Sequence, residues 1–172
     1  MHDPVRRDYL QSHIAAVAQA RDAGVPVSAY LFAPMGLAVN AGSKYRTLAE
    51  LTAQAKAAPN TVTYGTGGPG TTPHFASEAL GIATVVNFMH IPYKGGSDAA
   101  KDLIGGRVQY MFDSAPSAII AAQSGKVKIM AIAASQRVSA LPDVPTFAEQ
   151  GYTGMDLPSW LGFFGPANMP PA

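Results

Sequence analysis

The chain of 172 residues contains no cysteine, which excludes a disulfide framework and any cysteine-ligated metal site. Cysteine usage therefore leaves the redox compartment open, since a cysteine-free protein is stable in oxidising and reducing surroundings alike. Charged residues make up only 13% of the chain, against about 25% in an average globular protein. With 48% hydrophobic residues, this composition favours a compact folded chain over a disordered one.

The sequence also lacks an excess of either charge and any long apolar run. Lys and Arg number 12 and Asp and Glu number 11, which leaves a net charge of +1. We therefore expect no broad positive field that would attract nucleic acid or anionic lipid, and no membrane-spanning segment. The first residues, 1–7, lead straight into a polar helical pattern without the apolar stretch of an export signal.

At roughly 150 residues per domain, the length predicts one main domain with its own core. Apolar side chains recur at helical spacing and predict an amphipathic helix over residues 7–23: Leu10, Ile14, Val17 and Ala18. Residues 27–40 are apolar and predict extended structure. An alanine-rich helix is predicted over 48–58, with Thr47 and Glu50 forming a capping box at its start.

From residue 62 onward, predicted strands and helices alternate. The predicted strands cover 62–64, 85–91, 108–112 and 127–133, and the predicted helices cover 73–80, 97–104 with Ser97 as N-cap, and 116–123. A short helix over 146–150 and a final strand over 160–164 complete the pattern. Such alternation predicts an α/β fold, a three-layer sandwich around a mainly parallel sheet.

The loop after the first of these strands is rich in glycine. Gly65, Gly67 and Gly70 fit the spacing G-x-G-x-x-G of dinucleotide-binding loops. That motif also needs an acidic residue about 20 positions further on, and residues 89–92 contain none. A P-loop is excluded too, because Thr71 stands where its lysine belongs.

What remains is an anion-binding turn at a helix N-terminus, where free amides, the helix dipole and hydroxyl groups favour a carboxylate. The loop of residues 93–97 is built in the same way. The candidate ligand-binding residues are Thr66, Gly67, Gly70, Thr71, Thr72, His74, Tyr93, Lys94, Gly95, Gly96 and Asp113.

Structural interpretations of the same residues stay open. Glycine-rich loops also serve as plain tight turns, and His74 and Asp113 are as well suited to capping a helix as to holding a ligand. Lys94 could be a solvated charge and Tyr93 a packing residue.

Little in the sequence points to catalysis. The four histidines share no metal-ligand spacing, and a G-x-S-x-G motif is absent. We therefore name no catalytic residue and expect no metal or cofactor.

Several blocks together resemble a known family over residues 31–171. They are residues 45–51 (YRTLAEL), 64–74 (YGTGGPGTTPH), 90–96 (HIPYKGG), 111–113 (MFD) and 140–146 (ALPDVPT). In this order they resemble the substrate-binding proteins of tripartite tricarboxylate transporters, the Bug family of periplasmic receptors. The resemblance implies a periplasmic receptor whose two α/β lobes close on a carboxylate, which then passes to a membrane permease. Residues 31–172 resemble the second lobe alone.

Residues 3–30 resemble a different family, a C-terminal segment of the family 1 glycosidases. Residues 1–30 are accordingly expected to be a helical segment of foreign origin. The alternative function is then a small glycoside hydrolase, a β-glucosidase or β-galactosidase of chimeric origin. Such a fragment would lack both carboxylates that retaining hydrolysis needs, so a binding protein is favoured over an enzyme.

A single lobe cannot enclose its ligand, so the expected binding is weak unless a second wall is supplied. The apolar strands near Leu31 and Phe163 could pair with another copy of the chain and supply that wall. The expected partners are therefore a small carboxylate, a permease and a second copy in a homo-oligomer.

Overall fold

The computed structural model describes residues 27–164, with the backbone alone for 27–32, 158 and 160–164. The helix predicted over residues 7–23 lies outside the described residues. So does most of the segment 1–30, and its expected foreign origin stays a prediction.

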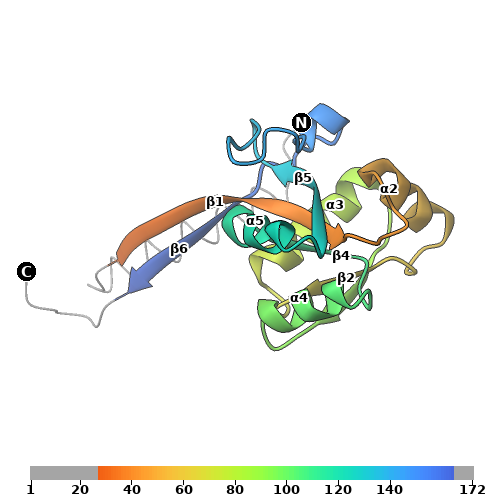
Figure 1. Ribbon diagram of the computed structural model, residues 1–172, viewed down its shortest axis with the longest axis horizontal. Coiled ribbons are helices and arrows are strands. Elements are labelled where there is room, and N and C mark those ends of the chain that lie inside the picture. Colours follow the sequence, from red (N-terminus) through yellow and green to blue (C-terminus); the bar gives the residue numbers. More distant parts are fainter. Residues whose placement is uncertain (1–26, 165–172) are drawn as a thin grey trace, which may run out of the picture.

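The described chain is built around a six-stranded sheet (Figure 1). Its strands are β1 (Val27–Asn40), β2 (Thr63–Thr66), β3 (Met89–Pro92), β4 (Tyr110–Ser114), β5 (Val127–Ala133) and β6 (Pro158–Phe164). The strand order is β3-β2-β4-β1-β5, with β6 paired to β1. β2 is parallel to β3 and β4, whereas β1 is antiparallel to β4, β5 and β6. The predicted α/β fold is confirmed, and its sheet is mixed.

Helices cover both faces of the sheet. They are α2 (Leu48–Ala57), α3 (Thr72–Thr84), α4 (Gly96–Ile104) and α5 (Ala115–Gln123), with a 3₁₀ turn η1 (Ala148–Gln150). α2 and α3 pack with Tyr110 and Phe112 of β4 in the larger buried cluster. α4 packs with Met111 in the smaller one. Because successive side chains of a strand point to opposite faces, β4 contributes to both clusters and separates the two helix layers.

The predicted strand over 85–91 is wrong at its start, because α3 continues to Thr84 and β3 begins only at Met89. Val85 ends the helix in the left-handed conformation, with φ of 54°. The amides of Val85 and Val86 donate to the carbonyls of Ile82 and Gly81. The last carbonyls of a helix need such donors, and here this requirement outweighs the strand preference of two valines.

Other boundaries shift by a few residues. α4 begins at Gly96 with Gly95 as its N-cap, so Ser97 is not the cap that the sequence predicts. β4 covers Tyr110–Ser114, so it begins and ends two residues later than the strand predicted over 108–112. The short helix predicted over 146–150 is reduced to the 3₁₀ turn η1.

The predicted cap of α2 is confirmed in its main bond. The Thr47 hydroxyl accepts from the Glu50 amide at 3.2 Å. The Glu50 carboxylate reaches one residue further than in a capping box and accepts from the Arg46 amide at 2.7 Å.

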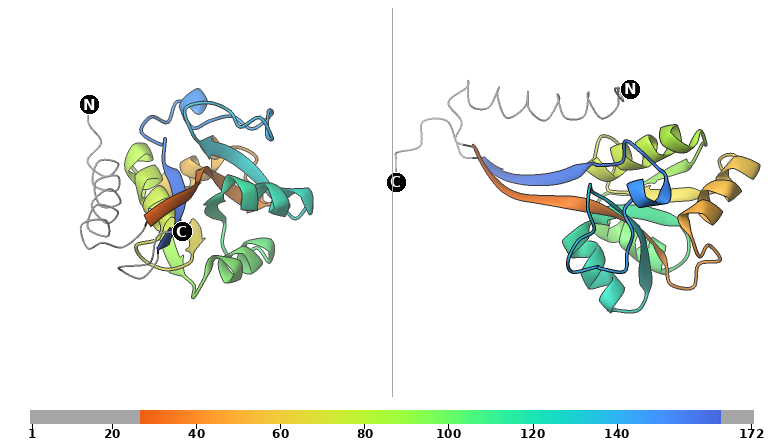
Figure 2. Two further views of the ribbon diagram at one scale, coloured as in Figure 1. Left: turned by 90° about the vertical axis from the view of Figure 1, so that its left-hand side faces the viewer. Right: turned by 90° about the horizontal axis from the view of Figure 1, so that it is seen from above.

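The first half of β1 and all of β6 form a two-stranded arm that extends beyond the body of the sheet (Figures 1 and 2). Val27 pairs with Phe164 at one end of the arm, and Pro34 pairs with Pro158 at the other. From Met35 onward, β1 lies between β4 and β5. The final predicted strand is thus confirmed, and its partner is β1.

Phe112 tests the importance of the larger cluster, because its side chain is fully buried in it. Phe112→Ala should lower the free energy of unfolding by about 3–5 kcal/mol, through lost burial and the cavity left behind. Urea denaturation followed by circular dichroism measures this change. Ile120→Ala is the matched control, since Ile120 on α5 is 70% exposed, and it should change stability by less than about 0.5 kcal/mol. Equal effects of the two substitutions would contradict the proposed position of the core.

Candidate functional site

The strand order places the carboxyl ends of β2 and β3 next to each other, because the two strands are parallel neighbours. The loop after β2 leads to α3 on one face of the sheet, and the loop after β3 leads to α4 on the other. Loops that diverge in this way define the switch point at which ligands bind in α/β sheets. Both glycine-rich loops of the sequence begin there.

The turn after β2 is held by its own hydroxyl groups. Thr66 is fully buried, and its hydroxyl accepts from the Gly68 amide at 3.1 Å. The Thr71 hydroxyl donates to the Gly68 carbonyl at 2.8 Å. Gly68 and Gly70 have φ of 121° and 79°, backbone angles that residues other than glycine rarely adopt. The two threonine hydroxyls therefore shape the turn before any ligand arrives.

The two glycine turns are in direct backbone contact. A Cβ atom on Gly67 would lie 3.1 Å from the Gly96 nitrogen and 3.4 Å from the Gly95 carbonyl carbon. The Tyr93 amide donates to the Thr66 carbonyl at 2.9 Å and ties the second loop to the end of β2. Residues that are nearly thirty positions apart in sequence thus form one surface, as the ligand-binding hypothesis requires.

The start of α4 leaves an amide available at this surface. Intrahelical bonding begins with the Asp98 amide, which donates to the Gly95 carbonyl at 3.2 Å, so Gly96 precedes it in the unpaired first turn. Lys94, immediately before the N-cap, is exposed. A helix N-terminus and an adjacent ammonium group are both favourable for a carboxylate.

Tyr93 supports α4 instead of presenting its hydroxyl to the turn. That hydroxyl donates to Asp102 at 2.7 Å, and its ring lies beside Gly65. Arg107 binds the same carboxylate at 2.6 Å. Burial, followed by the bond to Asp102, raises the pKa of Tyr93 to about 12, and the same bonds from Tyr93 and Arg107 lower the pKa of Asp102.

Two histidines contact the first turn, and only one of them was a candidate from the sequence. His74 accepts from the Gly70 amide through Nδ1 at 3.3 Å. His90 lies on β3 and contacts the Thr66 hydroxyl through Nε2 at 2.6 Å. Burial and then the nearby His74 lower the pKa of His90, whereas Glu78 acts in the opposite direction. The sequence signal for His90 was its place on the strand that ends in the second loop.

Asp113 lies at the carboxyl end of β4, the other parallel neighbour of β2. Its carboxylate accepts from the Ser114 amide at 2.8 Å, beside the start of α5. Burial raises the pKa of Asp113. Thr72 is the first residue of α3 and follows its N-cap, Thr71.

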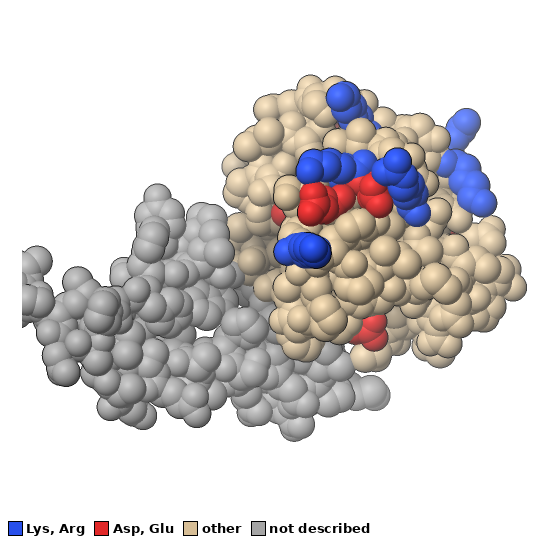
Figure 3. Space-filling model, turned by 90° about the horizontal axis from the view of Figure 1, so that it is seen from below, with Lys and Arg blue, Asp and Glu red and all other residues tan. Residues whose placement is uncertain are grey.

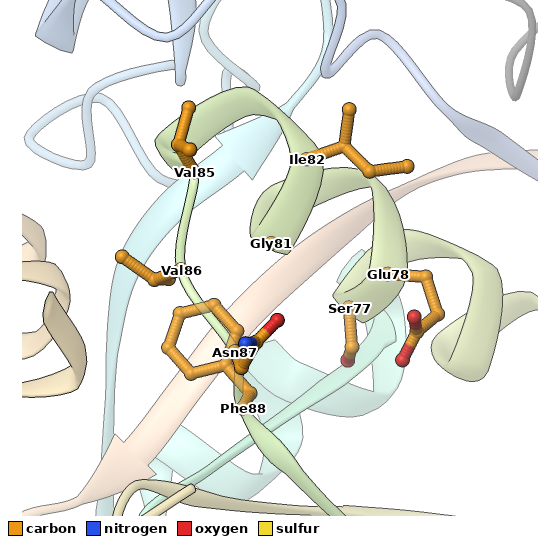
Figure 4. Close-up of a pocket in the computed structure, with 8 residues that line it drawn as sticks. All are labelled: Ser77, Glu78, Gly81, Ile82, Val85, Val86, Asn87 and Phe88. Atoms are coloured by element: carbon orange, nitrogen blue, oxygen red, sulfur yellow. The ribbon is translucent and has the colours of Figure 1, made fainter. Parts of the chain in front are cut away.

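A separate hollow of about 360 Å³ lies between the end of α3 and the segment before β3 (Figure 4). It is lined by Ser77, Glu78, Gly81, Ile82, Val85, Val86, Asn87 and Phe88. None of the sequence-predicted site residues lines it.

Within 27–164, no three histidine, aspartate or glutamate side chains gather as a metal site would require. No helix in this part of the chain has the length and apolar character needed to cross a membrane. The face shown in Figure 3 has both acidic and basic side chains. Among the described residues, Lys101 pairs with Asp98 and Arg107 pairs with Asp102, on and after α4.

Comparison with known families then identifies the chain. Residues 15–172 match the tripartite tricarboxylate transporter family receptor, TctC. The chain belongs to this receptor family. The match includes residues 15–30, within the segment expected to be foreign, and the comparisons give the glycosidase resemblance no support.

Individual relatives agree with this membership. The chain is 33% identical to protein BugT of Bordetella pertussis over 147 residues, which is 86% of this chain and 45% of BugT. It is 35% identical to a protein of Pseudomonas sp. strain P51, with 85% of this chain and 44% of the relative covered. The receptor chain thus spans less than half the length of these curated relatives.

Solved structures confirm the fold. MatC from Rhodopseudomonas palustris with bound malate is 30% identical and superposes with a TM-score of 0.77, over 83% of this chain and 49% of MatC. A second R. palustris protein, solved with adipate, is 29% identical with a TM-score of 0.80, over 85% and 49% of the two chains. The receptor chain therefore corresponds to one lobe of such proteins.

The contact between the two turns can be tested with a matched pair of glycine substitutions. Gly67→Ala should lower the free energy of unfolding by about 1–3 kcal/mol, because its Cβ meets backbone atoms that cannot yield without moving a turn. Gly96→Ala adds a Cβ with nothing within 4 Å, so it should be neutral or stabilise by up to about 1 kcal/mol. Urea denaturation compares both, and an innocuous Gly67→Ala would contradict the contact.

Asp113 gives a pH-dependent prediction. Its pKa is raised in the folded state, so ionised Asp113 destabilises the fold at neutral pH, and this penalty disappears as pH falls through the raised pKa and below the unfolded value. Asp113→Asn keeps an acceptor for the Ser114 amide and should raise the free energy of unfolding at pH 7. Urea melts at pH 7 and pH 3.5 measure the difference, which should shrink at the lower pH. A variant less stable than wild type at pH 7 would contradict this account.

Proposed function

We propose that the chain binds a small carboxylate, without chemical change, at the paired glycine turns after β2 and β3. The observation that carries the proposal is the contact of Gly67 with Gly95 and Gly96. It brings the turn that precedes α3 against the first residues of α4. Amides and dipoles of two helix N-termini can then act on one negatively charged group.

The chemistry of the site fits a carboxylate better than a larger polyanion. The two loops, residues 65–74 and 93–97, contain one lysine, Lys94, and no arginine, so the attraction comes mainly from amides and hydroxyls. The solved relatives described above contain malate in one case and adipate in the other. A dicarboxylate is therefore the appropriate first probe.

The ligand would be held between this lobe and a second wall. One lobe alone offers half of an enclosing surface, so we expect a dissociation constant on the order of millimolar, worth about 4 kcal/mol. In a full-length receptor the other lobe supplies that wall. For the described lobe by itself, we propose that a second copy, associating through the arm of β1 and β6, can supply the same wall.

Family membership supports the remaining parts of the proposal. One structural relative, BugD, is a periplasmic binding protein, and we propose the periplasm as the location of this receptor. The partner that takes the ligand is proposed to be the transporter permease. The glycoside hydrolase alternative requires a pair of catalytic carboxylates, and no observation on the described residues favours one.

Gly96 allows a single backbone amide to be removed as a test. Proline suits the first residue of a helix, and Gly95 before it is extended, at φ −173° and ψ 161°, as proline requires. Gly96→Pro should therefore keep α4 and delete only the amide hydrogen of residue 96. In calorimetric titration with malate, we expect saturable heat from wild type and binding at least about tenfold weaker in Gly96→Pro, a loss of roughly 1.4 kcal/mol.

Gly96→Ala is the matched control, because it changes the same residue but keeps the amide, and it should bind like wild type. Circular dichroism and the thermal midpoint verify that both variants are folded. Wild type without saturable heat for malate, adipate or citrate would overturn the proposed function. Equal affinity of folded Gly96→Pro and Gly96→Ala for malate would show that the first amide of α4 does not bind the ligand.

A further inference from the structure

A column of four aromatic rings leads from the core to the first glycine turn. Tyr110 of β4, fully buried, stacks on Tyr64 of β2 with ring centroids 5.4 Å apart. Tyr64 stacks on His90 of β3 at 4.9 Å, and His90 lies 4.5 Å from His74 of α3. The column thus passes across three neighbouring strands and ends on the helix that the turn precedes.

Its last two rings hold the two ends of the turn. His90 contacts the Thr66 hydroxyl where β2 ends, and His74 accepts from the Gly70 amide just before α3 begins. Gly70 N–H is a donor, so His74 Nδ1 must carry a lone pair, and the proton of the neutral ring is on Nε2. A proton added to Nδ1 would end this bond and release the Gly70 amide.

The charged surroundings limit the pair to one positive charge. Two imidazolium rings at 4.5 Å would repel each other, and burial further opposes a charge on His90. Glu78 on α3 has the opposite effect, and its carboxylate accepts from the Tyr64 hydroxyl at 2.5 Å. From β2 and β4, the titratable groups in the column are Tyr64 and Tyr110, and the residues of β3 beside His90 are uncharged.

We propose that His74 is a proton-linked part of the anion site, and that binding of a carboxylate at the glycine turn is accompanied by uptake of one solvent proton at His74 Nδ1. The released Gly70 amide and the new imidazolium charge then both act on the ligand. His90 is a positioning residue, which holds Thr66 and stays neutral while His74 is charged. No covalent bond forms, and this inference rests on the proposed function.

Linkage gives the expected pH dependence. When binding of a ligand makes the protein take up a proton, the ligand binds more tightly as pH falls through the histidine range. Malate affinity of wild type should therefore be about threefold to tenfold higher at pH 6 than at pH 8. Both malate carboxylates remain ionised over most of this range, so the change reports on the protein.

The test is calorimetric titration with malate in two buffers of equal pH and ionic strength but different ionisation enthalpy. At pH 6.5 the difference in heat should show net proton uptake on malate binding, and this uptake should be smaller at pH 8.5. His74→Gln keeps an acceptor for the Gly70 amide but cannot titrate, so its proton uptake should vanish. His90→Gln keeps a donor for Thr66, and its uptake should persist.

NMR of the wild-type protein tests the same inference without any substitution. The His74 ring resonances should move toward their protonated positions when malate is added at pH 6.5. Saturable binding without proton uptake, or uptake that survives in His74→Gln, overturns the inference and leaves the proposed function standing. Absence of saturable heat in wild type at every pH overturns the proposed function and the inference with it.

Discussion

The site depends on one steric constraint, the contact of Gly67 with the first residues of α4. A Cβ on Gly67 would lie 3.1 Å from the Gly96 nitrogen, so even the smallest side chain would force one of the two backbones to shift. Glycine here serves close approach, whereas Gly68 and Gly70 serve the left-handed backbone of the same turn. Two different physical requirements therefore explain why so short a loop contains so many glycines.

The topology of the sheet places this contact at the edge where we propose that the ligand binds. β2 lies between β3 and β4, and α3 and α4 leave its neighbourhood toward opposite faces. Both helices must be anchored firmly for their first amides to stay aligned. The buried apolar side chains of each helix provide this anchoring, with Leu80 on one face and Leu103 on the other.

Periodicity predicted the order and type of nearly all described elements, because buried strands and amphipathic helices differ in the spacing of apolar residues. It failed at Val85, where two valines favour a strand but the helix needed a left-handed end. It also failed at Ser97, since Gly95 caps α4 with an extended backbone and without a side chain. The positions of the glycine turns were predictable and their role as an anion site stays a prediction, but the contact between them depends on strand order. His90 was missed as a site residue for the same reason.

The missing amide hydrogens of two paired prolines affect how the arm of β1 and β6 can bend. Pro34 and Pro158 face each other where β1 passes from its pairing with β6 to its place between β4 and β5. Neither residue has an amide hydrogen, so this rung of the ladder cannot contain an N–H···O bond donated by either of them. Bending the arm at this rung breaks no hydrogen bond donated by either proline, so we expect the arm to bend here and at the pairing irregularity between Ala29 and Leu31.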